Sequence, residues 1–338
     1  MKDFAVLGFG EVMLRLSPSG RERIAQSEMF IKHAGGSELN VISGITRLGL
    51  RTGLISKLPD NIPGHYVRNK IRSYGVSDDY VINDRDPDAR LGIYYYESGV
   101  YPRKPQIAYD RSGSSFGTIC LDDLPGDIFE QTEVFHVSGI SLALGKTARN
   151  TAIELMKGFK AAGATISFDV NYRANLWSED EAREVVHSIL PMVDLLFVSE
   201  ETSRRMLQRT GTTEEIMKGY YEDYGTKLVA STQREVLSPI RHNFNSKIYA
   251  GEFDRFVEGI GYNNIEVIDR IGSGDAYISG ILYALLKGKP LEEVIEYGNT
   301  MSAVKNTVAG DLISTDLKEI EGIMKDLTAT GYVSELNR

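Results

Sequence analysis

The sequence predicts an α/β fold in which a mostly parallel central sheet carries helices on both faces and a small β lid lies beside it. Two observations predict this fold. From residue 133 onward, short apolar strand patterns alternate with helix patterns, and repeated βα units build a parallel sheet covered by helices. Two earlier stretches, about 11–33 and 90–113, break this rhythm with strand patterns of their own. We expect residues 1–338 to form one domain with these stretches as its lid.

The composition is that of an ordinary folded protein. The 338 residues are 42% hydrophobic and 25% charged, which excludes wholesale disorder and allows a sizeable core. The net charge of −9 argues against a nucleic-acid surface, so an anionic ligand needs a local counter-charge. No stretch reaches the roughly 18 apolar residues of a membrane span. A single cysteine, Cys120, cannot form an internal disulfide, and we expect a cytoplasmic protein.

The N-terminal region supplies the first strands and a glycine pair. Residues 4–10 predict a buried strand that ends in glycines, but the third glycine and the immediate helix of a dinucleotide-binding site are missing. Residues 11–16 alternate as a second strand instead. Gly35 and Gly36 open an amphipathic helix, and Asn40 lies one helical turn after Gly36. Paired glycines let backbone approach a ligand, and a simple turn also explains them.

The remaining elements follow in chain order. Aromatic strand patterns at 90–97 and 106–111 predict a small antiparallel flap. A polar, hairpin-like region is expected up to about residue 268. Further strands are predicted at 52–58, 134–138, 165–170, 194–198 and 227–231. Helices are predicted at 63–74, 146–162, from 178, from 213, and at 272–286, 291–308 and 317–327, with capping boxes at Ser178–Glu181 and Thr212–Glu215.

The most informative stretch is 269–276, directly before an apolar helix. Gly272, Ser273 and Gly274 form a turn whose backbone N–H groups lie at the positive end of the helix dipole, where an anion is stabilised without a lysine. Asp275 lies in the first helical turn, where the same dipole keeps its carboxylate ionised and able to accept a proton. A general base beside an anion-binding turn suits phosphoryl transfer to a hydroxyl. Taken alone, the octapeptide equally fits an ordinary glycine turn before a helix.

The order of these motifs resembles the ribokinase-like (PfkB) carbohydrate kinases. The resemblance covers nearly the whole chain and rests on Gly35-Gly36 with Asn40, the early inserted strands, and Gly272-Ser273-Gly274-Asp275. Shorter motifs look like the 2-keto-3-deoxygluconate kinase branch of that family: Leu91–Tyr94, Tyr109–Arg111, Asp169–Arg173, Leu176-Trp177, Thr232–Glu235 and Gly310-Asp311.

The resemblance implies a ribokinase-like fold and an ATP-dependent kinase that phosphorylates 2-keto-3-deoxygluconate. It implies that Asp275 deprotonates the accepting hydroxyl, that Gly272, Ser273 and Gly274 face the phosphates, and that Mg²⁺ bridges those phosphates. The sugar contacts that it implies are Gly36, Asn40, Tyr94, Tyr109, Arg111, Arg173 and Asp311. The nucleotide contacts that it implies are Asn171, Thr232, Arg234, Ala303 and Asn306.

Two arginines agree with an acidic sugar as substrate. Arginine binds a carboxylate bidentately, and both Arg111 and Arg173 belong to the implied sugar site. Arg173 follows a buried strand, at the carboxyl edge of the sheet where open α/β folds bind ligands. A surface arginine packed on Trp177 is the alternative. The family's metal-associated Asn-x-x-Glu pattern falls near 199–202, where neither end matches, so the metal ligands are unknown.

Other functions stay open at this point. A fructokinase or a 5-dehydro-2-deoxygluconokinase is the alternative within the class of sugar kinases. A non-catalytic sugar-acid or nucleotide sensor on a kinase fold is the alternative from another class, since fold does not fix function. The intact base, Asp275, argues against a sensor. We also expect a homo-oligomer through the lid, because isolated strand pairs with exposed aromatic side chains are marginal in water.

Overall fold

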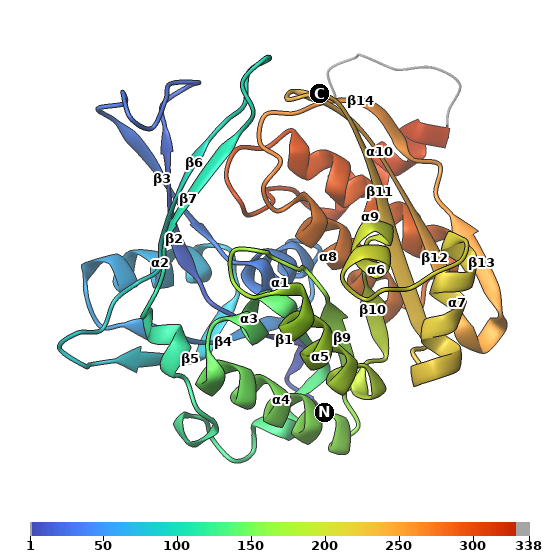
Figure 1. Ribbon diagram of the computed structural model, residues 1–338, viewed down its shortest axis with the longest axis horizontal. Coiled ribbons are helices and arrows are strands. Elements are labelled where there is room, and N and C mark those ends of the chain that lie inside the picture. Colours follow the sequence, from blue (N-terminus) through green and yellow to red (C-terminus); the bar gives the residue numbers. More distant parts are fainter. Residues whose placement is uncertain (1, 329–338) are drawn as a thin grey trace.

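The computed structural model of the protein describes residues 2–328, which form two β-sheets and a set of helices packed on the larger sheet (Figure 1). The strands of the larger sheet are β1 (Phe4–Phe9), β4 (Thr52–Pro59), β5 (Ser77–Asp84), β8 (Thr132–Ser138), β9 (Thr165–Asp169), β10 (Leu195–Phe197), β11 (Leu228–Ser238), β12 (Arg241–Ala250), β13 (Arg255–Glu258) and β14 (Tyr262–Glu266). Those of the smaller sheet are β2 (Met13–Pro18), β3 (Phe30–Gly35), β6 (Ile93–Glu97) and β7 (Gln106–Asp110).

The helices follow the strands in the order that a βα rhythm requires. They are α1 (Ser37–Arg47), α2 (Ile62–Ser73), α3 (Gly139–Ala143), α4 (Lys146–Ala161), α5 (Glu179–Ile189), α6 (Glu200–Arg205), α7 (Thr213–Tyr224), α8 (Ser273–Leu286), α9 (Leu291–Asn306) and α10 (Leu317–Thr328). Among the described residues, no helix is long and apolar enough to cross a membrane.

The larger sheet is parallel over most of its width. Its strand order is β13-β12-β11-β10-β9-β8-β1-β4-β5, and β14 pairs with β12. Every pair from β11 to β5 is parallel, whereas β12, β13 and β14 add an antiparallel edge. The central strand β1 is buried almost throughout, as a parallel strand covered on both faces should be.

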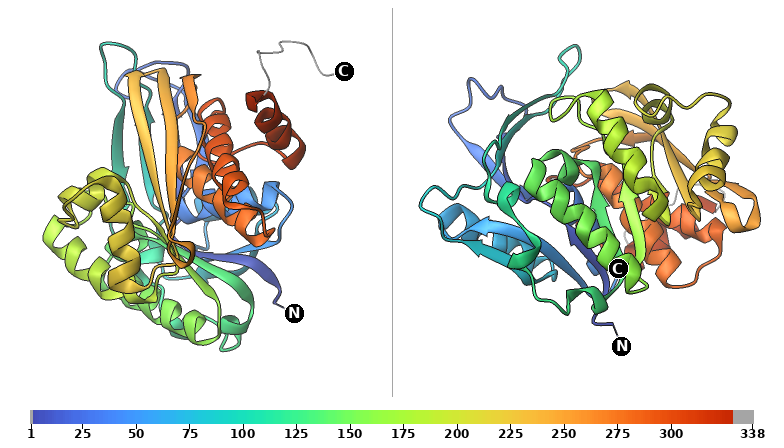
Figure 2. Two further views of the ribbon diagram at one scale, coloured as in Figure 1. Left: turned by 90° about the vertical axis from the view of Figure 1, so that its right-hand side faces the viewer. Right: turned by 60° about the horizontal axis from the view of Figure 1, so that its bottom comes forward.

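Helices cover both faces of this sheet and bury two hydrophobic cores. In β1, Val6 packs into one core and the next residue, Leu7, packs into the other, because successive side chains point to opposite faces. The first core joins the sheet to α1, α2, α8, α9 and α10, and the second joins it to α4, α5 and α7. Figure 2 shows the two groups of helices on opposite sides of the strands.

The smaller sheet stands apart from the larger one, in the order β3-β2-β6-β7 (Figure 1). On its face toward the glycine turn, Met13, Tyr94 and Tyr96 form a small cluster against Ile271. The strand β7 is exposed at every residue. The sheet therefore has one face that is packed and an edge strand that is open.

Most predicted elements are present, and the differences have local causes. The predicted strand at 227–231 is too short, because β11 continues to Ser238 as one arm of a hairpin with β12. The strand β5 and the short helices α3 and α6 were not predicted. The capping box at Thr212 and Glu215 is confirmed. At Ser178 the prediction is wrong: its hydroxyl accepts from the Glu181 N–H, but the Glu181 carboxylate pairs with Arg149.

Candidate active site

A cavity of about 430 Å³ lies where the parallel strands end, between the smaller sheet and the N-terminus of α8. The smaller sheet contributes Tyr94 and Tyr109 to its wall, and the segment that follows β9 contributes Asn171 and Arg173. The start of α8 supplies residues 272–275. Open α/β sheets bind ligands at this edge, so the cavity is the first candidate for an active site.

The turn before α8 can be made only with glycine at its first position. Gly272 caps the helix with a φ of +83°, and a Cβ there would lie 2.2 Å from the Asp311 carbonyl oxygen. A Cβ on Gly274 would meet no described atom within 4 Å, so the backbone at this position is open to the cavity. The first N–H groups of a helix have no acceptor within it. The turn therefore presents free donors to an anion in the cavity.

The predicted glycine pair has a packing role. A Cβ on Gly36 would lie 2.2 Å from the backbone oxygen of Glu11, which follows β1. Glycine at this position thus lets the start of α1 lie against the connection between the two sheets. Gly36 also lines the cavity, so close packing and access to a ligand coincide here.

Asp275 is held in place by two hydrogen-bond donors from α1. Its Oδ1 accepts from the Ser37 hydroxyl at 2.9 Å, and its Oδ2 accepts from Asn40 Nδ2 at 2.7 Å. Burial raises the pKa of the Asp275 carboxyl above its ordinary value, and the hydrogen bonds from Asn40 and Ser37 and the charge of Arg173 oppose the shift. A fixed carboxylate with a raised pKa beside an anion-binding turn is suited to accept a proton.

A second carboxylate supports this arrangement from the end of β9. Asp169 Oδ1 accepts from the Asn171 N–H at 3.1 Å and holds Asn171 at a φ of +35°. The Asn171 side chain then donates to Ser37 Oγ at 2.9 Å, which leaves the serine proton for Asp275. Burial and the nearby charge of Asp275 raise the pKa of Asp169 to about 7. The two carboxylates repel each other, and the amide and hydroxyl between them fix their positions.

Beneath the cavity lies a buried ionic cluster that we call the floor network, made of Arg15, Tyr94, Asp269 and Asp311. Arg15 donates to Asp311 Oδ1 at 2.9 Å and to Asp269 Oδ2 at 2.6 Å. The hydroxyl of Tyr94 donates to Asp311 Oδ2. Although burial alone lowers it, the charges of Asp311 and Asp269 raise the pKa of Arg15 above its ordinary value. Each charge in the network is therefore paired inside the protein.

Three arginines at the opening of the cavity behave differently, and we call Arg173, Arg234 and Arg270 the mouth arginines. All three line the cavity, and none of them forms an ion pair with a carboxylate within residues 2–328. Burial and the charges of Arg270 and Arg173 lower the pKa of Arg234. In a protein of net charge −9, this unpaired positive charge predicts an anionic ligand.

Arg111 is not free in the same way. Its guanidinium pairs with the Glu11 carboxylate, which also accepts from the Ser114 hydroxyl, and lies 5.6 Å from the ring centre of Tyr109. Of the two arginines predicted to neutralise a sugar acid, Arg173 therefore has the charge available. Arg173 donates a hydrogen bond to the carbonyl oxygen of the neighbouring Tyr172 at 3.1 Å.

The structure brings most of the predicted site residues together. Every predicted sugar contact lines the cavity, and so do the turn predicted to be catalytic and two of the predicted nucleotide contacts, Asn171 and Arg234. Thr232 lines an adjoining cavity of about 190 Å³ that also touches Asn171 and Gly274. The structure does not bring Ala303 and Asn306 to either cavity, because they are buried within α9.

Several residues of the site were missed by sequence reasoning. Ser37, Asp169 and Arg15 were not predicted, although Ser37 follows the glycine pair and Asp169 ends a buried strand. Arg15 carried no sequence signal, because its partners lie more than 250 positions away along the chain. A polar side chain that directly follows a glycine pair or a parallel strand is the signal that would have found the first two.

No protein cluster for a metal is apparent in the part of the chain that the structure describes. Within residues 2–328, no three or more His, Cys, Asp or Glu side chains lie together in a way that could hold a metal ion. In the segment 199–202, Ser199 caps α6 and Glu200 pairs with Arg204 at 2.8 Å. A Mg²⁺ ion in a phosphoryl-transfer site is held mainly by substrate phosphates and one or two carboxylates, which does not require such a cluster.

An anion-binding glycine turn and a fixed carboxylate at the edge of a parallel sheet define a phosphotransferase acting on a hydroxyl. Comparison with known proteins identifies the family within this class. The chain matches the pfkB family of carbohydrate kinases over residues 4–317 and belongs to that family. It is a sugar kinase, and kinases of this family use ATP.

Three similar proteins illustrate the relationship. A 2-dehydro-3-deoxygalactonokinase of Haloferax volcanii is 36% identical over 317 residues, which cover 94% of this chain and 95% of that protein. A 2-dehydro-3-deoxygluconokinase of Bacillus subtilis is 28% identical over 313 residues, covering 92% of each. The crystal structure of a 2-dehydro-3-deoxygluconokinase from Thermotoga maritima has a TM-score of 0.90 and 30% identity, covering 95% of this chain and 99% of that one. The ribokinase-like fold predicted from the sequence is thereby confirmed.

Proposed function

We propose that this sugar kinase transfers the γ-phosphoryl group of ATP to a hydroxyl of 2-keto-3-deoxygluconate, with Asp275 as the general base. The observation that carries the proposal is the unpaired charge of Arg173 in the same cavity as Asp275. A sugar carboxylate left unpaired in a closed cleft would cost several kcal/mol, so a site for a sugar acid needs such a cation. Two of the relatives described above are named for this substrate.

The chain's own residues account for the proton transfer and the charge. Asp275 receives the hydroxyl proton of the sugar while Ser37 and Asn40 hold its carboxylate in one orientation. The N–H groups of the 272–274 turn stabilise the negative charge that spreads over the transferred phosphoryl oxygens. Arg173 pairs with the sugar carboxylate, and Tyr94 and Tyr109 line the same cavity beside it.

The nucleotide fits along the edge of the sheet beside this cavity. We place its phosphates at the open glycine turn, with Asn171, Thr232 and Arg234 along it, because these residues line the two adjoining cavities. Mg²⁺ bound by the phosphates would neutralise part of their charge. Glu200 is already paired with Arg204, whereas Glu201 is exposed, so a protein contact to the ion through water falls more readily to Glu201.

The smaller sheet is suited to act as the lid of this site within a single domain. Its inner face carries Tyr109, which lines the cavity, and closing this sheet on the substrate would exclude water. Ile31 and Ile107 of this sheet are 50% and 41% exposed, and Ile107 lies on the inner face at the cavity, so we propose a homodimer in which exposed apolar side chains of two such sheets pack together. Light scattering at working concentration tests this, and a strictly monomeric protein would contradict it.

The lone free Cys120 agrees with a cytoplasmic location.

A second substrate is favoured by a specific finding. The relative with 36% identity is named for the galactonate compound, which differs from the gluconate compound only in the configuration of one carbon. Both substrates carry the carboxylate that Arg173 would bind, so that arginine does not distinguish them. Fructokinase and 5-dehydro-2-deoxygluconokinase activities remain the alternatives with other sugars, and a non-catalytic sensor is disfavoured because the chain is a kinase with Asp275 in place.

The test is an ATP-consumption assay on the purified protein over a panel of sugars and sugar acids. The panel holds 2-keto-3-deoxygluconate, its galactonate epimer, 5-keto-2-deoxygluconate, fructose and ribose. We expect the highest kcat/KM with one of the two 2-keto-3-deoxy acids. A higher kcat/KM with fructose or ribose would leave the protein a sugar kinase but would refute an acidic substrate.

A further inference from the structure

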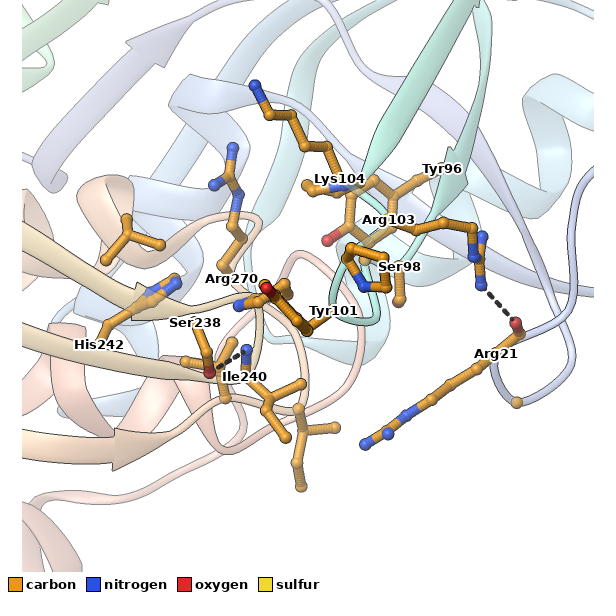
Figure 3. A pocket seen from close by; sticks show the side chains of 18 residues that line it. Arg21, Tyr96, Ser98, Tyr101, Arg103, Lys104, Ser238, Ile240, His242 and Arg270 are labelled. Atoms are coloured by element: carbon orange, nitrogen blue, oxygen red, sulfur yellow. Dashed lines mark hydrogen bonds between the residues drawn. The ribbon is translucent and has the colours of Figure 1, made fainter.

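Figure 3 shows a second cavity, of about 720 Å³. Among the described residues, only Arg270 lines both this cavity and the catalytic one. The walls of the second cavity come from the β6–β7 connection, the β2–β3 connection, the tip of the β11–β12 hairpin, and the segment before α8. The walls thus belong to both sheets. A ligand in this cavity would contact the smaller sheet and the larger one at once.

The lining of this cavity is positive in an acidic protein. Within residues 2–328, no Asp or Glu side chain lines it, although Arg21, Arg103, Lys104 and Arg270 do. Arg103 pairs with Glu97 and also donates to the Arg21 carbonyl at 3.1 Å. The other three cations have no carboxylate partner among the described residues. Three unbalanced positive charges match a ligand of two or three negative charges.

Two further observations point to an organic ligand. His242 lines the cavity at 1% exposure, and neither of its ring nitrogens has a hydrogen-bond partner. Buried polar groups are nearly always paired, so this imidazole has an unused donor and an unused acceptor. Tyr101, Ile240 and Ile268 also line the cavity and are 83%, 38% and 63% exposed, which provides an apolar surface for a flat group.

We propose that this cavity binds a nucleoside phosphate of two or three negative charges at a site separate from the catalytic cavity. Its phosphate would lie among Arg21, Lys104 and Arg270, and its base against Tyr101 and the neighbouring apolar side chains. The proposal concerns binding alone and does not depend on which sugar is phosphorylated.

The test is calorimetric titration of AMP into the ligand-free protein, because a nucleotide added to fill the catalytic cavity would also compete for this site. We expect one AMP to bind per chain, and the double variant Arg21→Ala/Lys104→Ala to bind it at least tenfold more weakly. Arg23→Ala, which removes an exposed charge from the same connection without lining the cavity, is the matched control. Absence of AMP binding, or equal binding by the double variant, would overturn the proposal. Inorganic phosphate binding as tightly as AMP would overturn the nucleoside part.

A different observation, a fully buried lysine in the last turn of α9, carries a second inference. Lys305 is 0% exposed, and its ammonium donates to the carbonyl oxygens of Asp269 at 3.2 Å and Val308 at 3.0 Å. Burial lowers the pKa of Lys305, and the charges of Asp269 and Asp311 oppose this. No carboxylate forms an ion pair with it in the described part of the chain.

The two carbonyl oxygens belong to the segments that build the catalytic cavity. Asp269 begins the stretch that leads into the glycine turn, and Val308 precedes Asp311 by three residues. We infer that Lys305 is a positioning residue whose internal cation holds these two segments together and so fixes the Gly272–Gly274 donors. Its charge also lies close enough to Asp275 to act on that carboxyl electrostatically.

Lys305→Met, of similar length but uncharged, tests this with whichever sugar the enzyme phosphorylates. We expect kcat to fall about 10- to 100-fold while KM for the sugar changes less than about threefold, as for a residue that positions the transition state. In Lys305→Ala, ammonium chloride should restore kcat at least fivefold, and tetramethylammonium chloride, whose cation is too bulky, should not. A wild-type kcat in Lys305→Met, or equal effects of the two salts on the folded Lys305→Ala variant, would overturn the inference.

Discussion

The floor network and the mouth arginines lie at two sides of the same cavity and use positive charge in opposite ways. In the floor, Arg15 is almost completely buried, and both carboxylates that it contacts, Asp269 and Asp311, accept further hydrogen bonds. At the mouth, Arg173 and Arg234 have no carboxylate partner among the described residues, and their positive charges repel each other. The charge of Arg15 is neutralised without a ligand, whereas the charges of the mouth arginines are not.

The difference separates residues that build the site from residues that recognise its ligand. Breaking a buried ion pair leaves an uncompensated charge in the protein and destabilises the fold. Removing one of several like charges that face solvent relieves repulsion, and its cost appears only when an anion binds. Substitutions in the floor should therefore lower stability, and substitutions at the mouth should lower affinity.

The largest expected effect belongs to Asp275, the proposed base, which lines the same cavity. Asp275→Asn keeps an oxygen and the approximate shape of the side chain but cannot accept the proton. We expect kcat to fall by roughly 10²–10⁴, the usual cost of losing a general base, with ATP affinity and thermal stability close to wild type. Steady-state kinetics and nucleotide titration check this. A turnover within about threefold of wild type would exclude Asp275 as the base.

The next largest effect should distinguish the floor from the mouth directly. Arg15→Met leaves Asp269 and Asp311 without their common cation, and we expect a loss of about 3–5 kcal/mol in the free energy of unfolding. Arg234→Met, the same substitution at the mouth, should change that free energy by less than about 1 kcal/mol. Urea denaturation followed by circular dichroism measures both. Equal losses in the two variants would contradict the distinction.

A smaller effect is expected in the dependence of stability on pH. The pKa of Asp169 is about 7 in the folded protein, against an ordinary value of 3.8. Between these values the folded state holds a proton that the unfolded state has lost, so the free energy of unfolding falls as pH rises, by at most about 1.4 kcal/mol per pH unit.

Asp169→Asn should remove this contribution and flatten the decline between pH 4 and pH 7. Asp122→Asn, at an exposed position, is the matched control. Urea denaturation at several pH values measures the slope, and an identical slope in wild type and Asp169→Asn would show that Asp169 does not titrate in this range.

The residues at the mouth of the site were easier to predict from the sequence than those of the floor network. The glycine turn, Asp275 and Arg173 carry local patterns, since each directly follows or precedes a strand or helix that periodicity reveals. Arg15 and its carboxylate partners meet only because β2, the segment before α8 and the segment after α9 fold together from distant parts of the chain. No spacing rule encodes such a contact.

The fold shows the same division. The βα rhythm gave the parallel strands and their helices, whereas β5 escaped prediction because four of its eight residues are acidic or asparagine. The extended β11 was missed for a related reason. Its outer half is exposed and, apart from Val236 and Leu237, polar, and pairing with β12, rather than burial, keeps it in a strand.

The central claim is that unpaired charge at the mouth selects an acidic sugar, and one measurement tests it most directly. That measurement is kcat/KM for 2-keto-3-deoxygluconate and for fructose, in wild type and in Arg173→Ala. The account predicts that wild type prefers the acid, and that Arg173→Ala loses about 10- to 100-fold with the acid but much less with fructose, since a charge-assisted contact contributes roughly 1.5–3 kcal/mol. Equal losses with both sugars, or a wild-type preference for fructose, would contradict it.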